Sequence, residues 1–249
     1  MGRTIFITGT NRGIGKAILN EFCKEPDVTI FAHARKQTEE FMGFVASLNE
    51  LHHCKVLPIF FDLSDPEGLE LSLRSILKEQ KQVDVLINNA GIMAQGNTFL
   101  MTNLTTMQDT FQVNFFSHVR ITQLVVKAMI RNGGGTIVNM SSIAALDGTA
   151  GQFEYTCSKS AMIGMTLRLA KELAPYKIRC NAVAPGLIDT DMMGYLKDDE
   201  RTALESKPYM GRFGSTEEVA ATVTFLASDR SSYINGQVFL VDGGLGRFN

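Results

Sequence analysis

The sequence predicts an α/β protein with one doubly wound sheet of seven parallel strands and helices on both faces. Short apolar runs alternate with longer helical stretches along all 249 residues. Most runs, such as Val83-Asp84-Val85-Leu86-Ile87, are apolar nearly throughout and do not alternate with polar residues. Strands of this kind are buried on both faces, as in parallel sheets covered by helices. No repeat, low-complexity tract or linker divides the chain, so we expect one domain over residues 1–249.

The expected strands and helices alternate. In chain order the strands are 4–8, 28–33, 56–61, 83–88, 136–141, 178–183 and 237–241. The helices are 13–24, 37–50, 66–81, 105–131, 155–174 and 215–228. Two helix starts carry clear signals: Ser64-Asp65-Pro66-Glu67 has a cap and a proline at the first helical position, and Ser215 with Glu218 forms a capping box. Because crossovers between parallel strands are right-handed, this alternation gives a doubly wound sheet.

Residues 187–213 break the alternation between the sixth and seventh strands. Ligands of open α/β sheets lie beyond the carboxyl ends of the strands, so we expect this excursion to be a substrate lid. Its Met192, Met193, Tyr195 and Leu196 suit an adaptable apolar lining. The alternative is a plain pair of surface helices.

Composition excludes several classes of function. A net charge of −2 gives no indication that the protein binds nucleic acid or an anionic membrane. The four cysteines and four histidines form no metal-ligand pattern, and free thiols fit a reducing compartment. The first strand begins almost at the initiator methionine, and no stretch is apolar for long enough to span a membrane, so we expect a cytoplasmic protein without a metal.

A glycine-rich turn follows the first strand. It reads Thr8-Gly9-Thr10-Asn11-Arg12-Gly13-Ile14-Gly15, with the spacing Gly-x-x-x-Gly-x-Gly. Glycines there permit a tight turn and a close approach of the backbone to a pyrophosphate, and the helix N-terminus adds oriented N–H groups. Together with the sheet, this turn indicates a Rossmann fold that binds a dinucleotide.

The end of the second strand indicates which dinucleotide. A site that prefers NAD usually places an acid here, but this sequence has Ala34 and then Arg35. Arg35 and Arg12 could bind a 2′-phosphate by charge-assisted hydrogen bonds, which favours NADP(H). The alternative is that both arginines merely cover the surface.

Tyr155 and Lys159 stand four residues apart at the start of a predicted helix, so their side chains share one face. A free tyrosine has a pKa of about 10, and a nearby ammonium favours the phenolate and lowers that pKa. Ser142 follows the fifth strand and is expected at the same edge of the sheet. A lone Tyr-x-x-x-Lys pair is common and would by itself be structural, so its meaning depends on the motifs around it.

These motifs give the chain a resemblance to the short-chain dehydrogenase/reductase family along essentially its whole length. The glycine turn, Asn88-Asn89-Ala90-Gly91, Ser142, Tyr155-x-x-x-Lys159 and Pro185-Gly186 occur in the order typical of that family.

The resemblance implies a catalytic tetrad of Asn114, Ser142, Tyr155 and Lys159. Ser142 would orient the substrate oxygen, and Tyr155 would donate the proton during reduction. Lys159 would lower the tyrosine pKa and hold the nicotinamide ribose, while Asn114 would position a water in the proton relay. Ser141 competes for the serine role, but Ser142 has the family's spacing to Tyr155.

The resemblance also implies a set of cofactor contacts. Asp62-Leu63 would contact the adenine, Asn89 and Gly91 would form the wall of the cleft, and 185–190 would contact the nicotinamide and phosphates. The full expected set is Gly9, Asn11, Arg12, Gly13, Ile14, Gly15, Arg35, Asp62, Leu63, Asn89, Ala90, Gly91, Tyr155, Lys159, Pro185, Gly186, Ile188 and Thr190.

Within the family the chain is most similar to 3-oxoacyl-[acyl-carrier-protein] reductases. The reaction that this similarity implies is the NADPH-dependent reduction of a ketone, most simply a 3-oxoacyl thioester carried on an acidic carrier protein. Such reductases resemble one another in arginines near the ends of two helices, where this chain has Gly133 and Tyr176, with Arg131 and Lys177 close by. The alternatives are a hydroxysteroid or small-alcohol dehydrogenase and a non-catalytic dinucleotide sensor, against which the intact Tyr155 and Lys159 argue.

The substrate pocket is expected to be apolar and without fixed charge, which favours an uncharged, partly hydrophobic carbonyl. Its expected lining is Ile92, Met93, Ile143, Ala144, Ala145, Phe153, Leu187, Met192, Met193 and Leu196.

The helix that starts at Tyr155 is apolar or small nearly all round over residues 160–170. A second apolar face needs a second partner, and the family resemblance implies a homotetramer with two-fold symmetries. The alternative is that the 191–213 excursion covers this face.

Overall fold

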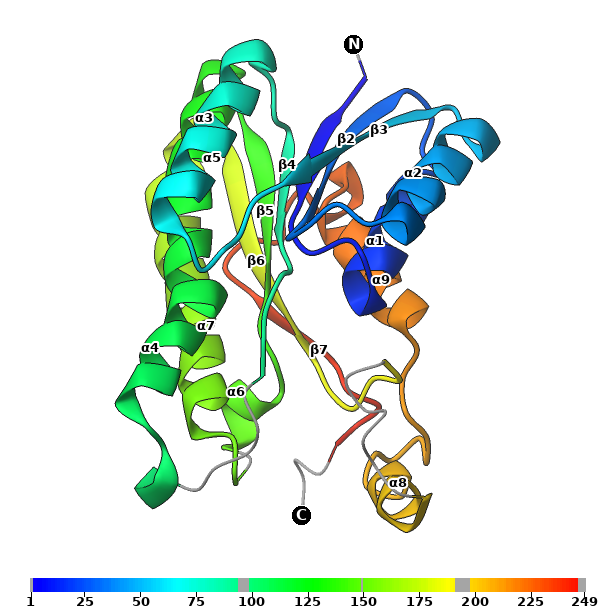
Figure 1. Cartoon of the computed structure of the whole chain (residues 1–249), viewed down its shortest axis with the longest axis vertical. Helices are drawn as coiled ribbons and strands as arrows, with labels where there is room; N and C mark the ends of the chain where they lie inside the picture. Colours follow the sequence, from blue (N-terminus) through cyan, green and yellow to red (C-terminus); the bar gives the residue numbers. More distant parts are fainter. Residues whose placement is uncertain (1, 94–98, 149, 191–197, 246–249) are drawn as a thin grey trace.

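The computed structural model describes residues 2–93, 99–148, 150–190 and 198–245. Its centre is a seven-stranded sheet with the strand order β3-β2-β1-β4-β5-β6-β7 (Figure 1). All neighbouring strands pair in parallel. The strands are β1 Thr4–Ile7, β2 Val28–Ala34, β3 Cys54–Phe60, β4 Val85–Asn88, β5 Gly135–Met140, β6 Ile178–Pro185 and β7 Val238–Val241. The doubly wound parallel sheet that the sequence predicts is confirmed.

Two layers of helices cover the sheet, as Figure 1 shows. One layer holds α1 (Gly13–Phe22), α2 (Glu39–Leu51) and α9 (Thr216–Leu226). The other holds α3 (Pro66–Glu79), α5 (Ser117–Arg131) and α7 (Phe153–Leu173). Each layer closes its own apolar core against the sheet, and side chains of the two cores alternate along β1, with Ile5 and Ile7 in the first and Phe6 in the second.

Shorter helices complete the described part of the chain. They are α4 (Leu104–Phe111), α6 (Ala144–Asp147) and α8 (Asp198–Glu205), with 3₁₀ turns at Phe99–Met101, Ala174–Tyr176 and Asp229–Ser231. A π-helical segment, Gln112–Phe116, joins α4 to α5. The single helix expected over 105–131 is therefore interrupted by a wider turn, a feature that is frequent at functional sites.

The helix starts follow the sequence signals. Asp65 caps α3 by accepting a hydrogen bond from Gly68 N at 3.0 Å, with Pro66 at the first position. Ser215 and Glu218 form the expected capping box. The helix expected from Tyr155 begins two residues earlier, at Phe153, so that Tyr155 lies in its first turn.

The fourth strand begins at Val85, two residues later than expected, although Asp84 still bonds to the neighbouring strands. Its carboxylate accepts a hydrogen bond from Thr4 N at 2.7 Å, just before β4 begins at Val85.

The described part of the 187–213 excursion contains α8, while Met192, Met193, Tyr195 and Leu196 lie outside the described residues. Arg201 of α8 forms ion pairs with Asp189 at 3.0 Å and Glu205 at 3.2 Å. Its guanidinium also lies 4.8 Å from the centre of the Phe213 ring. These contacts hold α8 on the side of the molecule that carries α9 (Figure 1).

Candidate functional site

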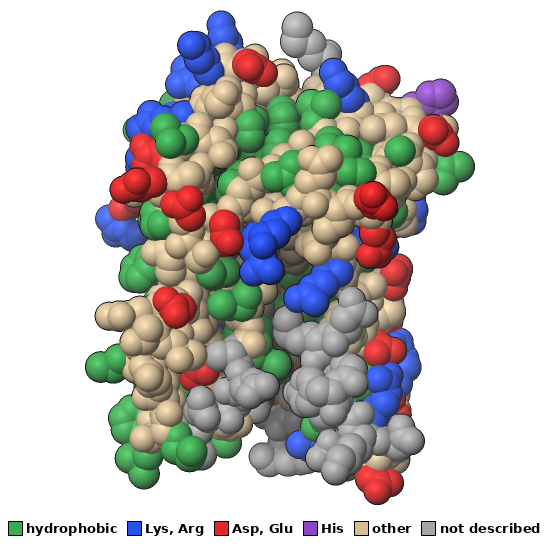
Figure 2. Space-filling view, viewed as in Figure 1, with side chains coloured by type: hydrophobic (Ala, Val, Ile, Leu, Met, Phe, Trp, Pro, Cys, Tyr) green, Lys and Arg blue, Asp and Glu red, His purple; other side chains and the backbone are tan. Residues whose placement is uncertain are grey.

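A cleft of about 1300 Å³ opens at the carboxyl edge of the sheet. The ends of β1 to β6 and the loops that follow them line it, which is where ligands bind in open α/β sheets. In Figure 2, Lys and Arg side chains border the hollow near the middle of the view. Every expected cofactor contact lines this cleft, as do three members of the expected tetrad: Ser142, Tyr155 and Lys159.

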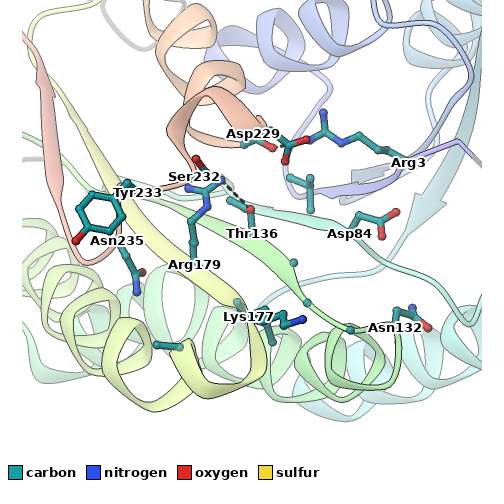
Figure 3. Close-up of a pocket in the computed structure, with 17 residues that line it drawn as sticks. Arg3, Asp84, Asn132, Thr136, Lys177, Arg179, Asp229, Ser232, Tyr233 and Asn235 are labelled. Atoms are coloured by element: carbon teal, nitrogen blue, oxygen red, sulfur yellow. Dashed lines mark hydrogen bonds between the residues drawn. The ribbon is translucent and has the colours of Figure 1, made fainter.

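A second pocket, of about 670 Å³, lies at the opposite, amino edge of the sheet (Figure 3). Arg179 lines this pocket. Its guanidinium donates to Thr136 Oγ1 at 3.1 Å and to the carbonyls of Leu226, Ser228 and Ile234. Because these bonds tie β6 to the loops beside α9 and β7, the arginine has a structural role.

The glycine turn can be built only with glycine at two of its positions. Gly9 has a φ of +71°, and a Cβ there would lie 2.9 Å from Ala90. A Cβ on Gly15 would lie 1.9 Å from Gly9 O and 2.5 Å from Asn89 Nδ2. The first turn of α1 therefore packs directly against the entry of the loop.

The N-terminus of α1 is suited to an anion. Arg12, its N-cap, makes no side-chain cap, and the first turn carries no acidic residue. The first residues of the helix, Gly13, Ile14 and Gly15, line the cleft. Their backbone N–H groups and the positive end of the helix dipole therefore form a cradle for phosphate. Thr190 also lies beside the N-terminus of α1: a Cβ added to Gly13 would be 3.7 Å from Thr190 Cγ2.

Asn89 supports this cradle from β4. Its side-chain amide donates to Thr8 O at 2.9 Å and to Gly9 O at 3.0 Å. Thr8 Oγ1 in turn accepts from the backbone N–H groups of Asn89 and Ala90. Thr8 is a residue of the site that the sequence analysis did not single out; it is a buried hydroxyl at the end of an apolar strand.

The expected 2′-phosphate corner is positively charged. Arg12 and Arg35 are both exposed and both line the cleft. Asp62 lies nearby, and its pKa is lowered by hydrogen bonds from the backbone and hydroxyl of Ser64 and by the charges of Arg35 and Lys36. A phosphate bound at this corner and the carboxylate of Asp62 would therefore both be attracted to Arg35.

Ser142 and Tyr155 meet at the cleft. The Ser142 hydroxyl lies near enough to the Tyr155 phenol to act on its pKa, which it lowers, and Ser142 Oγ accepts from Ala144 N at 3.2 Å. Ser141 has a different role, because its hydroxyl donates to Lys159 O at 2.9 Å and so holds α7 against the end of β5. The geometry therefore favours Ser142 as the serine of the site.

Lys159 is almost fully buried, with an exposed fraction of 4%. Its Nζ donates to Met140 O at 3.0 Å and lies 5.9 Å from the centre of the Tyr155 ring. Burial lowers the pKa of Lys159 to about 8. The Lys159 amine is therefore still protonated at neutral pH, but its pKa lies closer to 7 than that of an exposed lysine.

The expected direction of the Tyr155 pKa needs a correction. Although the side chain is partly exposed to the cleft, burial raises its pKa, and the hydrogen bond with Ser142 opposes that effect only in part. Lys159 is not among the causes of the shift. In the protein alone, desolvation is the larger effect, so the pKa of Tyr155 lies above its usual value and the phenol keeps its proton at neutral pH.

Asn114 lies in the π-helical segment and, unlike the other three members of the tetrad, does not line the cleft. Its Oδ1 accepts from Ile92 N at 2.8 Å, and its Nδ2 donates to Ile92 O at 2.8 Å and Ser158 Oγ at 3.0 Å. Both N–H donors thus have protein partners, and the side chain positions the segment after β4. The expected water relay would have to use the remaining lone pair of Oδ1.

The end of β6 closes the other side of the cleft. Pro185 O accepts from Ile143 N at 2.9 Å, which ties the segment after β5 to β6. A Cβ on Gly186 would lie 2.7 Å from Asp242 Cβ, so only glycine fits beside β7.

The substrate end of the cleft is partly as expected. Of the expected apolar lining, five residues are present: Ile92, Met93, Ile143, Ala144 and Leu187. Ala145 and Phe153 do not line it; the Phe153 ring packs edge-on against Phe99 at 5.0 Å. Met192, Met193 and Leu196 lie outside the described residues.

The expectation that the pocket carries no fixed charge is wrong for the cleft as described. Asp147, Gln152 and Lys207 also line it. Lys207 is exposed and comes from the segment after α8, where sequence periodicity gives no indication of which side chains turn inward.

Neither a metal-binding cluster nor a membrane-spanning helix is present among the described residues. No group of three or more His, Cys, Asp or Glu side chains is arranged there to hold a metal ion. Likewise, no described helix combines the length and the apolarity needed to cross a membrane.

The fold and the site define a dinucleotide-dependent oxidoreductase. A family model described as Enoyl-(Acyl carrier protein) reductase matches residues 9–246. The chain belongs to the short-chain dehydrogenase/reductase family.

Curated and solved relatives agree with this assignment. The 3-oxoacyl-[acyl-carrier-protein] reductase FabG of Thermotoga maritima is 39% identical over 98% of each chain. The L-sorbose reductase of Gluconobacter frateurii, solved with NADPH and L-sorbose, is 30% identical with a TM-score of 0.87, covering 98% of this chain and 96% of that one. A Beutenbergia cavernae protein described as an NAD(P)-dependent gluconate 5-dehydrogenase, solved with NADP, is 30% identical with a TM-score of 0.90 and the same coverage.

Proposed function

We propose that this enzyme reduces the ketone of a 3-oxoacyl thioester to a secondary alcohol with NADPH. The observation that carries the proposal is that Ser142, Tyr155 and Lys159, the last one turn further along α7, line the same cleft as the glycine turn. The relatives named 3-oxoacyl-[acyl-carrier-protein] reductases support the choice of substrate.

The residues of the cleft fit the dinucleotide. The backbone N–H groups of residues 13–15 would hold the pyrophosphate, Arg12 and Arg35 the 2′-phosphate, and Asp62-Leu63 the adenine. Lys159 would hold the nicotinamide ribose, with Ile188 and Thr190 beside the phosphates. When bound, NADPH supplies the hydride that reaches the carbonyl carbon.

The chain's own residues supply the proton. Ser142 donates a hydrogen bond to the substrate oxygen and orients it. Because burial keeps Tyr155 protonated, its hydroxyl can donate a proton to that oxygen as the alcohol forms. The positive charge of Lys159 stabilises the resulting phenolate until a proton from solvent restores the phenol.

Reduction of a sugar or small ketone is the second candidate. The polar lining from Asp147, Gln152 and Lys207 would suit a hydroxylated substrate, and two solved relatives carry names of sugar-converting enzymes. A long acyl chain would instead use Ile92, Met93 and Leu187.

A substrate screen decides between these candidates. NADPH oxidation is followed with 3-oxoacyl thioesters of increasing length, with ketoses and with steroid ketones, and NADH is tested in parallel. We expect kcat/KM for the thioesters to rise about fourfold for each of the first few methylenes, since burial of one is worth about 0.8 kcal/mol. A preference for ketoses without dependence on chain length would favour the second candidate, and a preference for NADH would refute the role of Arg35.

Delivery of the substrate on a carrier protein is a further part of the proposal. Gly133 and Lys177 line the pocket at the amino edge of the sheet, where Figure 3 labels Lys177, and Tyr176, which precedes Lys177 in the chain, is half exposed. Lys177 and Arg131, at the ends of the two helices, are cations near this pocket that could meet an acidic partner. Comparing kcat/KM for the same acyl group on carrier protein and on a small thiol, with Lys177→Glu, would test this.

A further inference from the structure

His33 is a buried side chain of β2 that the proposed chemistry does not use. It lines the cleft but is only 2% exposed. Each of its ring nitrogens contacts a peptide group of a different segment. Gly9 N–H donates to His33 Nδ1 at 3.2 Å, and His33 Nε2 lies 2.9 Å from Phe61 O.

These two partners determine the state of the ring. A peptide N–H can only donate and a peptide carbonyl can only accept. Nδ1 must therefore be an acceptor and Nε2 must carry the hydrogen, which is the neutral Nε2–H tautomer. Burial supports this state, since it lowers the pKa of His33 to about 4. The Phe61 ring, whose centre lies 4.0 Å away, fixes the plane of the imidazole.

Gly9 is the residue through which His33 can act on the phosphate cradle. Its carbonyl lies against the first turn of α1, where a Cβ on Gly15 would be 1.9 Å away. The orientation of the Gly9 peptide therefore sets how closely the loop approaches the helix N-terminus. Asn89 holds Gly9 O from the β4 side, at 3.0 Å.

His33 holds the loop from the β2 side, at two consecutive residues. Its ring accepts from Gly9 N, and its backbone carbonyl accepts from Thr10 N at 2.8 Å and Thr10 Oγ1 at 3.0 Å. Without the ring, the backbone bonds to Thr10 would remain, but the N–H of the partly buried Gly9 would lose its acceptor.

We propose that His33 is a positioning residue for the dinucleotide, because its neutral ring links Gly9 of the phosphate cradle to the end of β3. The proposal rests on the proposed function in that the ligand is NADPH. It adds a residue that acts through the loop and does not touch the reacting atoms.

Three substitutions separate the two hydrogen bonds. His33→Asn keeps an acceptor near the place of Nδ1, whereas His33→Gln keeps a donor near the place of Nε2, and His33→Leu keeps neither. The dissociation constant of NADPH is measured by fluorescence titration without substrate, and kcat is measured at saturating NADPH. Thermal melting of each variant shows that it is folded.

We expect His33→Leu and His33→Gln to weaken NADPH binding about tenfold, which corresponds to one hydrogen bond of about 1.4 kcal/mol. His33→Asn should recover most of the affinity, and kcat should stay within a few fold for all three. Equal weakening by Asn and Leu, unchanged affinity in all variants, or a loss confined to kcat would overturn the proposal.

The unmodified protein offers a second test that does not depend on the folding of variants. The ¹⁵N chemical shifts of His33 at neutral pH should show a hydrogen on Nε2 and none on Nδ1, and the opposite tautomer would refute the proposal. Because binding is measured without substrate, a wrong ketone assignment leaves the test valid. An unmodified protein that did not bind NADPH would instead refute the proposed function, and the role of His33 with it.

Discussion

Tyr155 and Lys159 show how one environment affects an acid and a base in opposite ways. Burial raises the pKa of the phenol and lowers that of the amine, because in both cases it disfavours the charged form. Both residues are thus biased toward neutral states. Charge on Lys159 becomes useful when a phenolate has to be stabilised next to it, which is the moment of proton transfer to the substrate.

Replacing the phenol isolates its role. Tyr155→Phe should lower kcat by roughly 10²–10⁴-fold, the usual value of a positioned general acid. NADPH affinity should change little, because the substitution removes only the hydroxyl and the ring stays in place. Single-turnover kinetics and an NADPH titration measure the two effects. A purified variant with normal turnover would contradict the assignment of Tyr155 as the acid.

The pH dependence of the rate should report Lys159. Its pKa is lowered from 10.5 to about 8, so the ammonium is present below pH 8 and is lost as the pH rises through that value. We therefore expect kcat at saturating NADPH to fall above about pH 8. If kcat instead stayed level to pH 10, the charge of Lys159 would not take part in catalysis.

At the scale of an element, α1 and the turn before it form a phosphate cradle by close packing. Gly15→Ala should abolish measurable NADPH binding, since its Cβ would have to lie within 1.9 Å of Gly9 O. Gly43→Ala in α2 is the matched control: nothing lies within 4 Å of its added Cβ, and it should stabilise the helix by up to about 1 kcal/mol. NADPH titration and thermal melting of both variants test this, and tight binding by the first would refute the packing argument.

The elements that the sequence predicts well are those with a long apolar run or a clear cap. The capping box of α9 and the proline start of α3 lie where the sequence places them because their signals are local. The π-helical segment around Asn114 depends on hydrogen bonds to Ile92 and Ser158 of other elements, which no local pattern contains.

In the site, too, local motifs are predictable from the sequence and contacts between distant segments are not. The order of its motifs brings Ser142, Tyr155 and the glycine turn to one edge of the sheet. What the sequence misses is the support behind them: Thr8 and His33 act through bonds to segments more than twenty residues away. The role of His33 could have been found from the sequence, because a histidine within the mostly apolar run of β2 is a buried polar residue that needs hydrogen-bond partners.

At the scale of the whole molecule, two buried histidines make stability depend on pH. His33 and His118 have pKa values lowered to about 4 and about 3, mainly by burial, from 6.5. Between pH 6.5 and these values the unfolded chain binds protons that the folded chain does not, so the free energy of unfolding falls as the pH falls. Each contributes roughly 3 to 5 kcal/mol over the full range.

Chemical unfolding at pH 7 and pH 5 measures this loss. His118 donates from Nε2 to Ala90 O at 2.8 Å, so His118→Gln, which keeps a donor without titrating near pH 5, should show a smaller decrease between the two pH values. An unchanged decrease would mean that other groups, such as carboxylates, control acid stability.

Assembly is the last property at this scale. Large apolar side chains remain exposed on the helices of one layer, among them Leu104 of α4 at 74%, Phe116 at 52% and Leu167 of α7 at 47%. The helix α8 of the 187–213 excursion lies on the opposite side of the sheet (Figure 1) and does not cover them. We therefore expect a second copy to do so, in a homotetramer built from two-fold axes. Light scattering at micromolar concentration should give four times the 27.4 kDa of one chain.

Two matched substitutions locate the interface. Leu167→Asp places a charge on the exposed face of α7 and should reduce the mass to that of a dimer or monomer, because an unpaired carboxylate is costly to bury. Leu51→Asp at the end of α2 is the control; this leucine is 76% exposed but belongs to the other helical layer, and its replacement should leave the mass unchanged. If the unmodified protein has the mass of one chain, the tetramer is refuted. If only Leu51→Asp reduces the mass, the copies meet through the layer that carries α1, α2 and α9.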